Sequence, residues 1–307
     1  MAVTGTSVLT NQVDVAYDTM ARFALRAIPV FDQFSTVKAG SLTNPGTPVT
    51  FHIWTDMATQ TATLNEITDV TPVSLGSTTT TVTPAEKGMT TVTTAKLRAD
   101  TMLPAFEADR ANLVAYNLAR SVDELARDAL DGTTDETYVG QASEAAILST
   151  NIITADEFRK KRAALKTDNV LPMAGGNYVA IIHPEVAYDL KSETGDGAWV
   201  APHQYVDTAN IYNDEIGTFA GFRVLESDLC TLTADGGSTT VDTYRTYFLG
   251  QEALAKAVSI PPSIVPGPIT DYLKRLVPLG WYGYFGHDTF RDVAAKVLVS
   301  ASSIGDN

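Results

Sequence analysis

The sequence predicts an α+β protein with an extended β-hairpin arm, one long helix and a compact α/β unit. Residues 47–97 are rich in threonine and β-prone, but they contain few large apolar side chains. Residues 101–130 carry a helical apolar stripe, and a helix of that length is about 40 Å long. Residues 151–259 alternate between helix and strand patterns, which is typical of an α/β unit.

An amphipathic helix is expected near the N-terminus. Its apolar residues recur at spacings of four, three, four and three, which places them on one stripe: Val13, Tyr17, Met20, Ala24 and Ala27. A single stripe of this kind needs a second apolar surface, so the segment is predicted to be an arm that packs on a partner.

The threonine-rich region is predicted to form the hairpin arm. Its outgoing limb, residues 49–53, alternates with period two, and its return limb, residues 90–97, is β-prone but weakly apolar. Residues 61–83 between the limbs are mostly threonine, serine and small residues. Because an isolated two-stranded ribbon is at best marginally stable in water, we expect the arm to lie on another copy of the protein.

The long helix has clear end signals. Pro104 suits its first turn, Glu107 and Asp109 favour its positive end, and Gly132 marks its exit. Its apolar stripe consists of Val114, Leu118, Val122, Leu125 and Ala129.

The elements of the α/β unit follow from caps and apolar runs. Thr154 and Glu157 have the spacing of a capping box, which starts a helix toward Lys166. The apolar run 178–182 predicts a strand, and Pro184 starts the helix that follows it. Further along we expect a strand at 222–225, a hairpin turning at 235–237 with its return strand at 244–249, a rigid proline-rich crossover at 261–268, and strands at 279–285 and 293–299.

Composition excludes several classes of protein. The chain has 22 Lys+Arg against 36 Asp+Glu, and the resulting net charge of -14 disfavours a nucleic-acid reader and binding to anionic membranes. Cys230 is the sole cysteine, so neither an intrachain disulfide nor a multi-cysteine metal site can form. There is no signal-peptide pattern and no apolar run that spans a bilayer, so we expect neither export nor membrane insertion.

The sequence offers little evidence of chemistry. The triplet 183–185, His-Pro-Glu, is better explained by the end of a strand and the first turn of a helix than by a metal site. The acidic residues Asp196, Asp214 and Glu215 are better explained as solvated surface groups than as cation ligands. Motifs of zinc proteases, hydrolases and nucleotide-binding proteins are absent from the sequence. We therefore predict no catalytic residue, no cofactor site and no metal site.

The sequence instead predicts a subunit interface. The aromatic residues at 281–285 have no Lys or Arg among them, so they indicate a half-buried strand and a subunit contact rather than base stacking. The apolar side chains of the N-terminal arm and of the hairpin arm also require a second surface that buries them. The predicted interface residues are Val13, Tyr17, Met20, Phe51, Ile53, Trp54, Val92, Trp281 and Tyr284.

The order of these parts resembles that of the major capsid proteins of tailed bacteriophages, which share the Hong Kong 97-type shell fold. The local sequence resembles them at residues 9–13, 17–18, 46–51, 87–88, 125–132, 182–185 and 215–224. The resemblance implies five parts: an N-terminal arm at 1–38, an extended hairpin or E-loop at 39–98, a peripheral domain with a spine helix at 99–149, an axial domain at 150–260, and a return to the peripheral domain at 261–307.

The resemblance also implies a function. It implies a major capsid protein, not an enzyme, that assembles with itself as pentamers and hexamers into an icosahedral head around double-stranded DNA. Such a protein is made in the host cytoplasm and ends in the virion. Scaffolding, portal and decoration proteins are candidate partners, DNA is in non-specific proximity, and no membrane is involved. Covalent cross-linking stays unassigned, because nothing identifies a partner for Lys87 on the arm.

Two alternatives stay open at this point. An encapsulin, a cellular compartment that encloses enzyme cargo, has the same shell fold. A soluble α/β hydrolase or binding protein would use residues 151–259 as its functional core.

Overall fold

The computed structural model describes residues 28–38, 48–100, 106–193, 215–268, 271–273 and 275–304. The chain divides into two compact units. The first unit includes Gly88–Leu118 and Ser263–Tyr282, and the second consists of Ala27–Lys87, Ala119–Pro262 and Gly283–Asn307.

The described elements run along the chain in the order expected, with strands before and after the long helix. In chain order they are η2 (Asp32–Phe34), β1 (Ser35–Lys38), β2 (Val49–Thr55), β3 (Gly76–Val82), β4 (Ala85–Thr94), α1 (Ala95–Asp100), α2 (Phe106–Asp131), β5 (Glu136–Tyr138), η3 (Glu144–Ala146), α3 (Ala155–Thr167), β6 (Tyr178–Ile182), α4 (Pro184–Ser192), β7 (Glu215–Phe219), β8 (Phe222–Glu226), β9 (Leu232–Thr233), β10 (Thr243–Leu249), β11 (Leu254–Pro266), β12 (Leu276–Thr289), η6 (Asp292–Ala294) and β13 (Ala295–Ser300).

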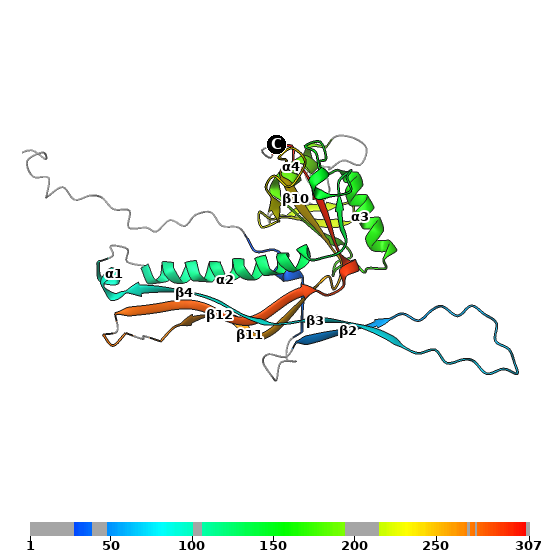
Figure 1. Ribbon diagram of the computed structural model, residues 1–307, viewed down its shortest axis with the longest axis horizontal. Helices are drawn as coiled ribbons and strands as arrows, with labels where there is room; N and C mark the ends of the chain where they lie inside the picture. The colour runs from blue at the N-terminus through cyan, green and yellow to red at the C-terminus, as the bar shows by residue number, and fades with distance from the viewer. Residues whose placement is uncertain are drawn as a thin grey trace, which may run out of the picture. The chain divides into compact units, whose positions relative to one another are not determined.

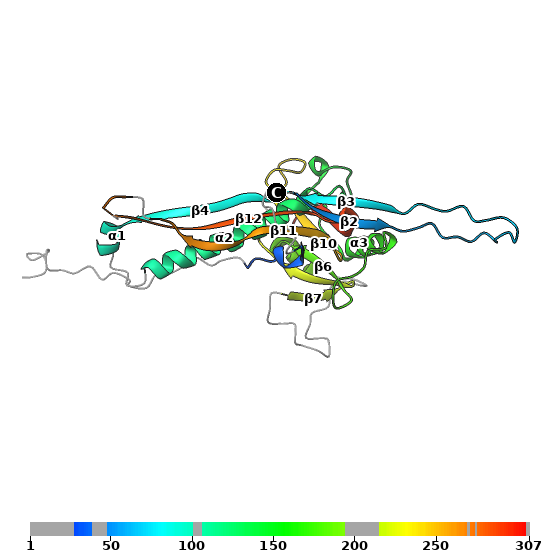
Figure 2. The ribbon, with the colours of Figure 1, turned by 90° about the horizontal axis from the view of Figure 1, so that it is seen from below.

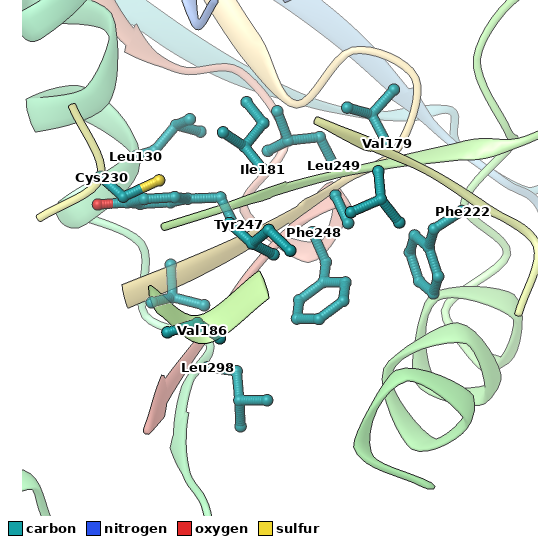
Figure 3. Close-up of a cluster of buried hydrophobic side chains, with 14 of the residues drawn as sticks. Leu130, Val179, Ile181, Val186, Phe222, Cys230, Tyr247, Phe248, Leu249 and Leu298 are labelled. Carbon is teal, nitrogen blue, oxygen red and sulfur yellow. The ribbon is translucent and has the colours of Figure 1, made fainter. Parts of the chain in front are cut away.

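The second unit is built on a seven-stranded sheet in the order β5-β13-β10-β6-β8-β7, with β9 beside β10. All five residues of β6 are buried, as expected for an apolar strand that is covered on both faces. Phe158 of α3 lies over the sheet, with its ring centroid 5.8 Å from that of Phe222 and 5.0 Å from that of Phe248. Figure 3 shows side chains of the central strands converging with Leu130 of α2 and Val186 of α4.

The two helices that follow the predicted caps begin where the sequence places them, but one cap differs. Thr154 precedes α3 without making a side-chain capping bond. The N–H of Ala155 instead donates to Glu193 Oε2 at 2.7 Å, from the end of α4. At α4 the predicted first-turn proline is confirmed, and His183 Nδ1 accepts the N–H of Glu185 at 3.4 Å.

The long helix is confirmed as α2, and its described part begins at Phe106, so Pro104 lies outside the described residues. Within the first unit, the buried Arg110 side chain donates to Thr93 Oγ1 at 2.7 Å and to the carbonyl of Val277 at 2.9 Å. A buried guanidinium is tolerated only when its N–H groups find acceptors, as they do here. None of the described helices is long and apolar enough to cross a membrane.

The pairing of the hairpin differs from the prediction. Strand β2 pairs antiparallel with β3, from Val49 opposite Val82 to Thr55 opposite Gly76. The predicted return limb at 90–97 is therefore wrong: it belongs to β4, in the four-stranded sheet β1-β11-β12-β4, and to the start of α1. The observed register is favoured because it brings the apolar ends of both strands together, while β-branched threonines suit the rest of β3.

The predicted crossover at 261–268 is also wrong over most of its length, because strand β11 includes Pro261, Pro262 and Pro266. Proline removes a backbone donor but accepts an extended conformation. Strand β1 pairs only with residues 254–257 of β11. Beyond Ala257 that edge of β11 has no partner among the described strands, so a proline whose missing N–H would face that edge costs little there. Successive N–H groups of a strand face opposite edges, so this accounts for one of the adjacent prolines Pro261 and Pro262.

Candidate functional site

The base of the hairpin is anchored within its own chain. Val49, Phe51 and Val82 are buried in a small cluster with Phe290 and two alanines of β11. The ring centroids of Phe51 and Phe290 are 5.0 Å apart, and the Thr80 hydroxyl donates to the Phe290 carbonyl at 2.9 Å. Phe51 is only 6% exposed, so it already has the cover that we expected from a neighbouring copy.

Beyond this base lies a long exposed segment, residues 56–75, which we call the arm loop. In Figures 1 and 2 it continues past the ends of β2 and β3. All 20 of its residues are exposed. Ile67 is 94% exposed, and the other exposed large apolar side chains of the arm loop are Met57, Leu64, Val70, Val73 and Leu75.

The arm loop has local order and a uniform charge. Asn65 Oδ1 accepts the N–H of Ile67 at 2.9 Å, which is the short-range turn typical of asparagine. Its charged residues are Asp56, Glu66 and Asp69, with no Lys, Arg or His among its 20 positions. It is therefore an acidic, apolar surface that the described part of its own chain leaves uncovered.

The predicted interface residues fall into three groups. Trp54 and Val92 are exposed, at 71% and 55%, and Ile53 and Tyr284 are partly exposed. Phe51 is buried at the hairpin base and Trp281 is buried in the first unit, where its Nε1–H donates to Asn117 Oδ1 at 2.8 Å. Val13, Tyr17 and Met20 lie outside the described residues. The interface itself stays a prediction.

Sequence reasoning missed a second apolar surface, in the first unit, which we call the tip surface. It comprises exposed side chains of α1 and of the segment between β11 and β12: Lys96, Leu97, Tyr272, Leu273, Arg275 and Leu276. The N–H of Ala95 donates to the Arg275 carbonyl at 2.7 Å, which holds α1 beside this segment. The sequence feature that could have indicated this surface is the Tyr-Leu pair at 272–273, which lies between charged residues in a short connection between strands.

The turn that carries the tip surface is ordered. Asp271 accepts the backbone N–H of Arg275 at 3.2 Å and its Nε–H at 2.8 Å. These hydrogen bonds lower the pKa of the Asp271 carboxyl. The turn leaves Tyr272 fully exposed and Leu273 72% exposed.

A buried ionic cluster in the second unit holds the segment that leads into β1. Asp123 of α2 is fully buried and accepts the backbone N–H groups of Val30 and Asp32 at 3.0 and 2.9 Å. The Asp32 carboxylate in turn accepts Lys256 Nζ at 2.7 Å and lies 2.8 Å from His287 Nε2. Burial raises the pKa of the Asp123 carboxyl. At Asp32 burial acts in the same direction, but the hydrogen bonds from His287 and Lys256 outweigh it, so the pKa of the Asp32 carboxyl is lowered.

Several other titratable groups take part in packing. Burial lowers the pKa of His183, and the Tyr244 hydroxyl donates to Glu185. Burial also lowers the pKa of Lys161, to about 8, where its Nζ donates to the Val297 carbonyl at 3.3 Å. Among the described residues no group of three or more His, Cys, Asp or Glu side chains could hold a metal ion.

Comparison with solved structures identifies the fold. The capsid of Ralstonia phage GP4 matches with a TM-score of 0.79 at 14% identity, over 100% of both chains. The capsid asymmetric unit of cyanophage Pam1 matches with a TM-score of 0.76 at 12% identity, over 99% of this chain and 100% of the other. A structure from Mycobacterium phage Che8 has a TM-score of 0.67 at 16% identity, over 94% and 98%. The predicted Hong Kong 97-type fold is confirmed.

The family follows from the sequence itself. A search of curated proteins gives no match. The family model described as phage capsid protein matches residues 129–297, which is more than half of the chain. The matched range runs from the end of α2 into β13 and so covers the seven-stranded sheet except for the last three residues of β13. The chain therefore belongs to the phage capsid protein family, with the Hong Kong 97-type fold of tailed-phage major capsid proteins.

Proposed function

We propose that this protein is the repeating subunit of an icosahedral phage head, in which pentamers and hexamers enclose double-stranded DNA. The arm loop carries this proposal. It presents six large apolar side chains to solvent, while the base of the same hairpin is anchored in its own chain. Several large apolar side chains exposed on one segment of a folded protein mark a site of interaction, and here the available partner is another copy.

The anchored base makes the arm loop an effective contact. Because Phe51 and Val82 are packed against Phe290, the strands that present the loop are already ordered before assembly. Ordering of interface segments is one of the main costs of association, so this packing lowers the free energy that assembly must supply. Each large apolar side chain that a neighbour fully buries contributes roughly 1.5–3 kcal/mol before the remaining ordering cost.

Closed symmetry turns modest contacts into a stable shell. Each subunit both gives an arm loop and receives one, so every subunit in a ring is held on two sides. Several contacts that form together dissociate far more slowly than any one of them alone.

The negative net charge of the chain is compatible with a shell that encloses DNA. The net charge of -14 limits adhesion of the packaged nucleic acid to the shell. The proposal places synthesis in the host cytoplasm and the final location in the virion. Portal, scaffolding and decoration proteins are candidate partners in this role.

The test is removal of the arm loop. Residues 56–75 are replaced by Asn-Gly, which closes β2 and β3 with a tight turn. We expect a soluble, folded subunit that forms no closed shells in negative-stain images or by light scattering. The matched control changes Thr59, Thr61 and Thr63 of the loop to Ser and should assemble normally. Regular shells from the shortened chain would refute the role of the loop.

The contents of the same particles distinguish a phage head from an encapsulin-like compartment. An encapsulin-like compartment would enclose protein cargo, whereas a phage head made during infection holds nuclease-protected DNA. The phage capsid family match favours the second, and it disfavours a soluble hydrolase or binding protein.

A further inference from the structure

We propose that one side of helix α3 is a binding surface for a polyanion, and that in the assembled head it contacts the packaged double-stranded DNA. The surface consists of Arg159, Arg162 and Lys166, and we call it the basic stripe. This inference rests on the proposed function and deepens it, because it names the part of the subunit that touches the DNA.

Helix α3 is locally basic in an acidic protein. Its 13 residues contain five Lys and Arg against two acidic residues, whereas the whole chain has 22 Lys+Arg against 36 Asp+Glu. The residues of the basic stripe follow one another at spacings of three and four, so they lie on one side of the helix. The stripe is roughly 10 Å long at about 1.5 Å per residue, and one strand of B-DNA carries a phosphate about every 3.4 Å along its axis. It therefore spans about three phosphates.

Ion pairs within the chain neutralise the acidic groups of α3. Lys160 Nζ lies 2.9 Å from Asp156 Oδ2 and 2.8 Å from Glu157 Oε1. At the other end of the helix, the C-cap residue Asp168 pairs with Lys296 at 2.7 Å. These three carboxylates already have cations beside them, so they do not cancel the charge of the basic stripe.

The basic stripe keeps cations for an outside anion. Lys166 is exposed, and neither its ammonium group nor the Arg162 guanidinium has an ion-pair partner among the described residues. Arg162 lies against the turn between β7 and β8, where a Cβ on Gly221 would come within 2.4 Å of the Arg162 Cζ atom. The turn therefore restricts the guanidinium before binding, and an ordered guanidinium loses less conformational entropy when it binds a phosphate.

The absence of apolar anchors favours a nucleic acid over a protein partner. Protein interfaces depend on buried apolar and aromatic anchors, whereas protein–DNA interfaces are more polar and positively charged. Phe158 and Leu165 of α3 are buried, and none of the exposed large apolar side chains in the described part of the chain belongs to α3. Contacts to phosphates alone carry no sequence information, so the basic stripe binds DNA of any sequence.

Binding of a DNA duplex to the free subunit tests the basic stripe. A fluorescein-labelled duplex is titrated with the full-length, unassembled subunit and followed by fluorescence anisotropy at several NaCl concentrations. Combining Arg162→Gln with Lys166→Gln should weaken binding at low salt roughly tenfold, and it should lower the slope of log K against log salt by about two, one for each phosphate contact removed. The single variant Lys166→Gln changes only an exposed position and should lower the slope by about one.

The charge-matched control combines Lys96→Gln with Lys191→Gln, which removes two exposed cations outside α3. This control should change the affinity for the duplex by less than about twofold, because salt screens charges that do not touch the DNA. Thermal melts of both double variants check that each is folded.

Filled particles show whether the packaged DNA reaches the basic stripe. Formaldehyde joins lysine amines to DNA bases that are in contact with them. After fixation of DNA-filled particles and nuclease digestion, mass spectrometry should find nucleotide adducts on peptides that contain Lys166, and empty shells should give none. The absence of adducts at Lys166 in filled particles would overturn the assignment.

The remaining results separate this inference from the proposed function. Equal loss of affinity in the two double variants, or no measurable binding of the duplex to the unaltered subunit, would overturn the basic stripe and leave the shell-forming role intact. Loss of closed shells from the α3 double variant with unchanged duplex binding would identify the stripe as a protein contact and would also overturn it. Particles that hold protein cargo in place of DNA would refute the proposed function, whatever the affinity of the free subunit for the duplex.

Discussion

Replacing Phe51 with alanine tests the anchored base of the hairpin without changing the arm loop. Phe51 is 6% exposed and packs against Phe290 in a cluster that is separate from the main core. Replacing a buried Phe with Ala costs about 3–5 kcal/mol, and the lower end applies here because the cluster is small and next to solvent. Since the seven-stranded sheet does not depend on this cluster, we expect Phe51→Ala to loosen the hairpin without unfolding the subunit.

Hydrogen exchange measures this local opening. A loss of about 3 kcal/mol corresponds to roughly 100-fold faster exchange at residues 49–55 and 76–82, since about 1.4 kcal/mol is tenfold. Peptides from β10 should keep their protection. The matched control is Trp54→Ala on the same strand, which is 71% exposed and should leave exchange at the base unchanged. Unaltered exchange of the hairpin in Phe51→Ala would refute the reasoning.

Three further predictions concern stability. Burial lowers the pKa of Lys161 to about 8 from 10.5, so between these values the unfolded chain binds more protons and stability rises with pH. Denaturant titrations should show that Lys161→Met is more stable than wild type at pH 7, by up to roughly 3 kcal/mol, and that the gap shrinks by pH 10. Gly280→Ala should destabilise the protein by about 1–3 kcal/mol, because the added Cβ would lie 2.4 Å from the Met89 carbonyl oxygen. The added Cβ of Gly76→Ala meets nothing closer than 3.5 Å, so thermal melts should show unchanged or slightly higher stability for this variant. The buried Thr246 hydroxyl finds no hydrogen-bond partner among the described residues, so calorimetry of Thr246→Val should show unchanged or higher stability.

The sequence allowed most of the elements to be predicted, because their signals are local. An apolar run of five residues predicts β6, and the proline that follows it starts α4. The stripe from Val114 onward predicts α2. Where signals were local, only details such as the cap at Thr154 differed.

Long-range pairing could not be predicted in the same way. Threonines at positions 78–81 carry no alternation of apolar and polar residues, so they do not specify a register or a partner. The burial of Phe51 depends on Phe290, which lies far along the chain. The prolines of β11 suit an edge that has no partner among the described strands past residues 254–257, and the residues of β11 do not encode that neighbour.

The distribution of apolar residues along the hairpin suits the proposed role, in which a subunit stays soluble before assembly and binds its neighbours within the shell. The apolar pair Val49 and Val82 lies at the base and is covered by the chain itself. In the arm loop the apolar residues are spaced among threonines and three acidic groups, so no long apolar run is presented to a wrong partner. A surface of this kind binds weakly unless the acceptor is ordered and complementary in charge. The acidic groups and threonines that limit aggregation of the free subunit would therefore also favour an acceptor of complementary charge.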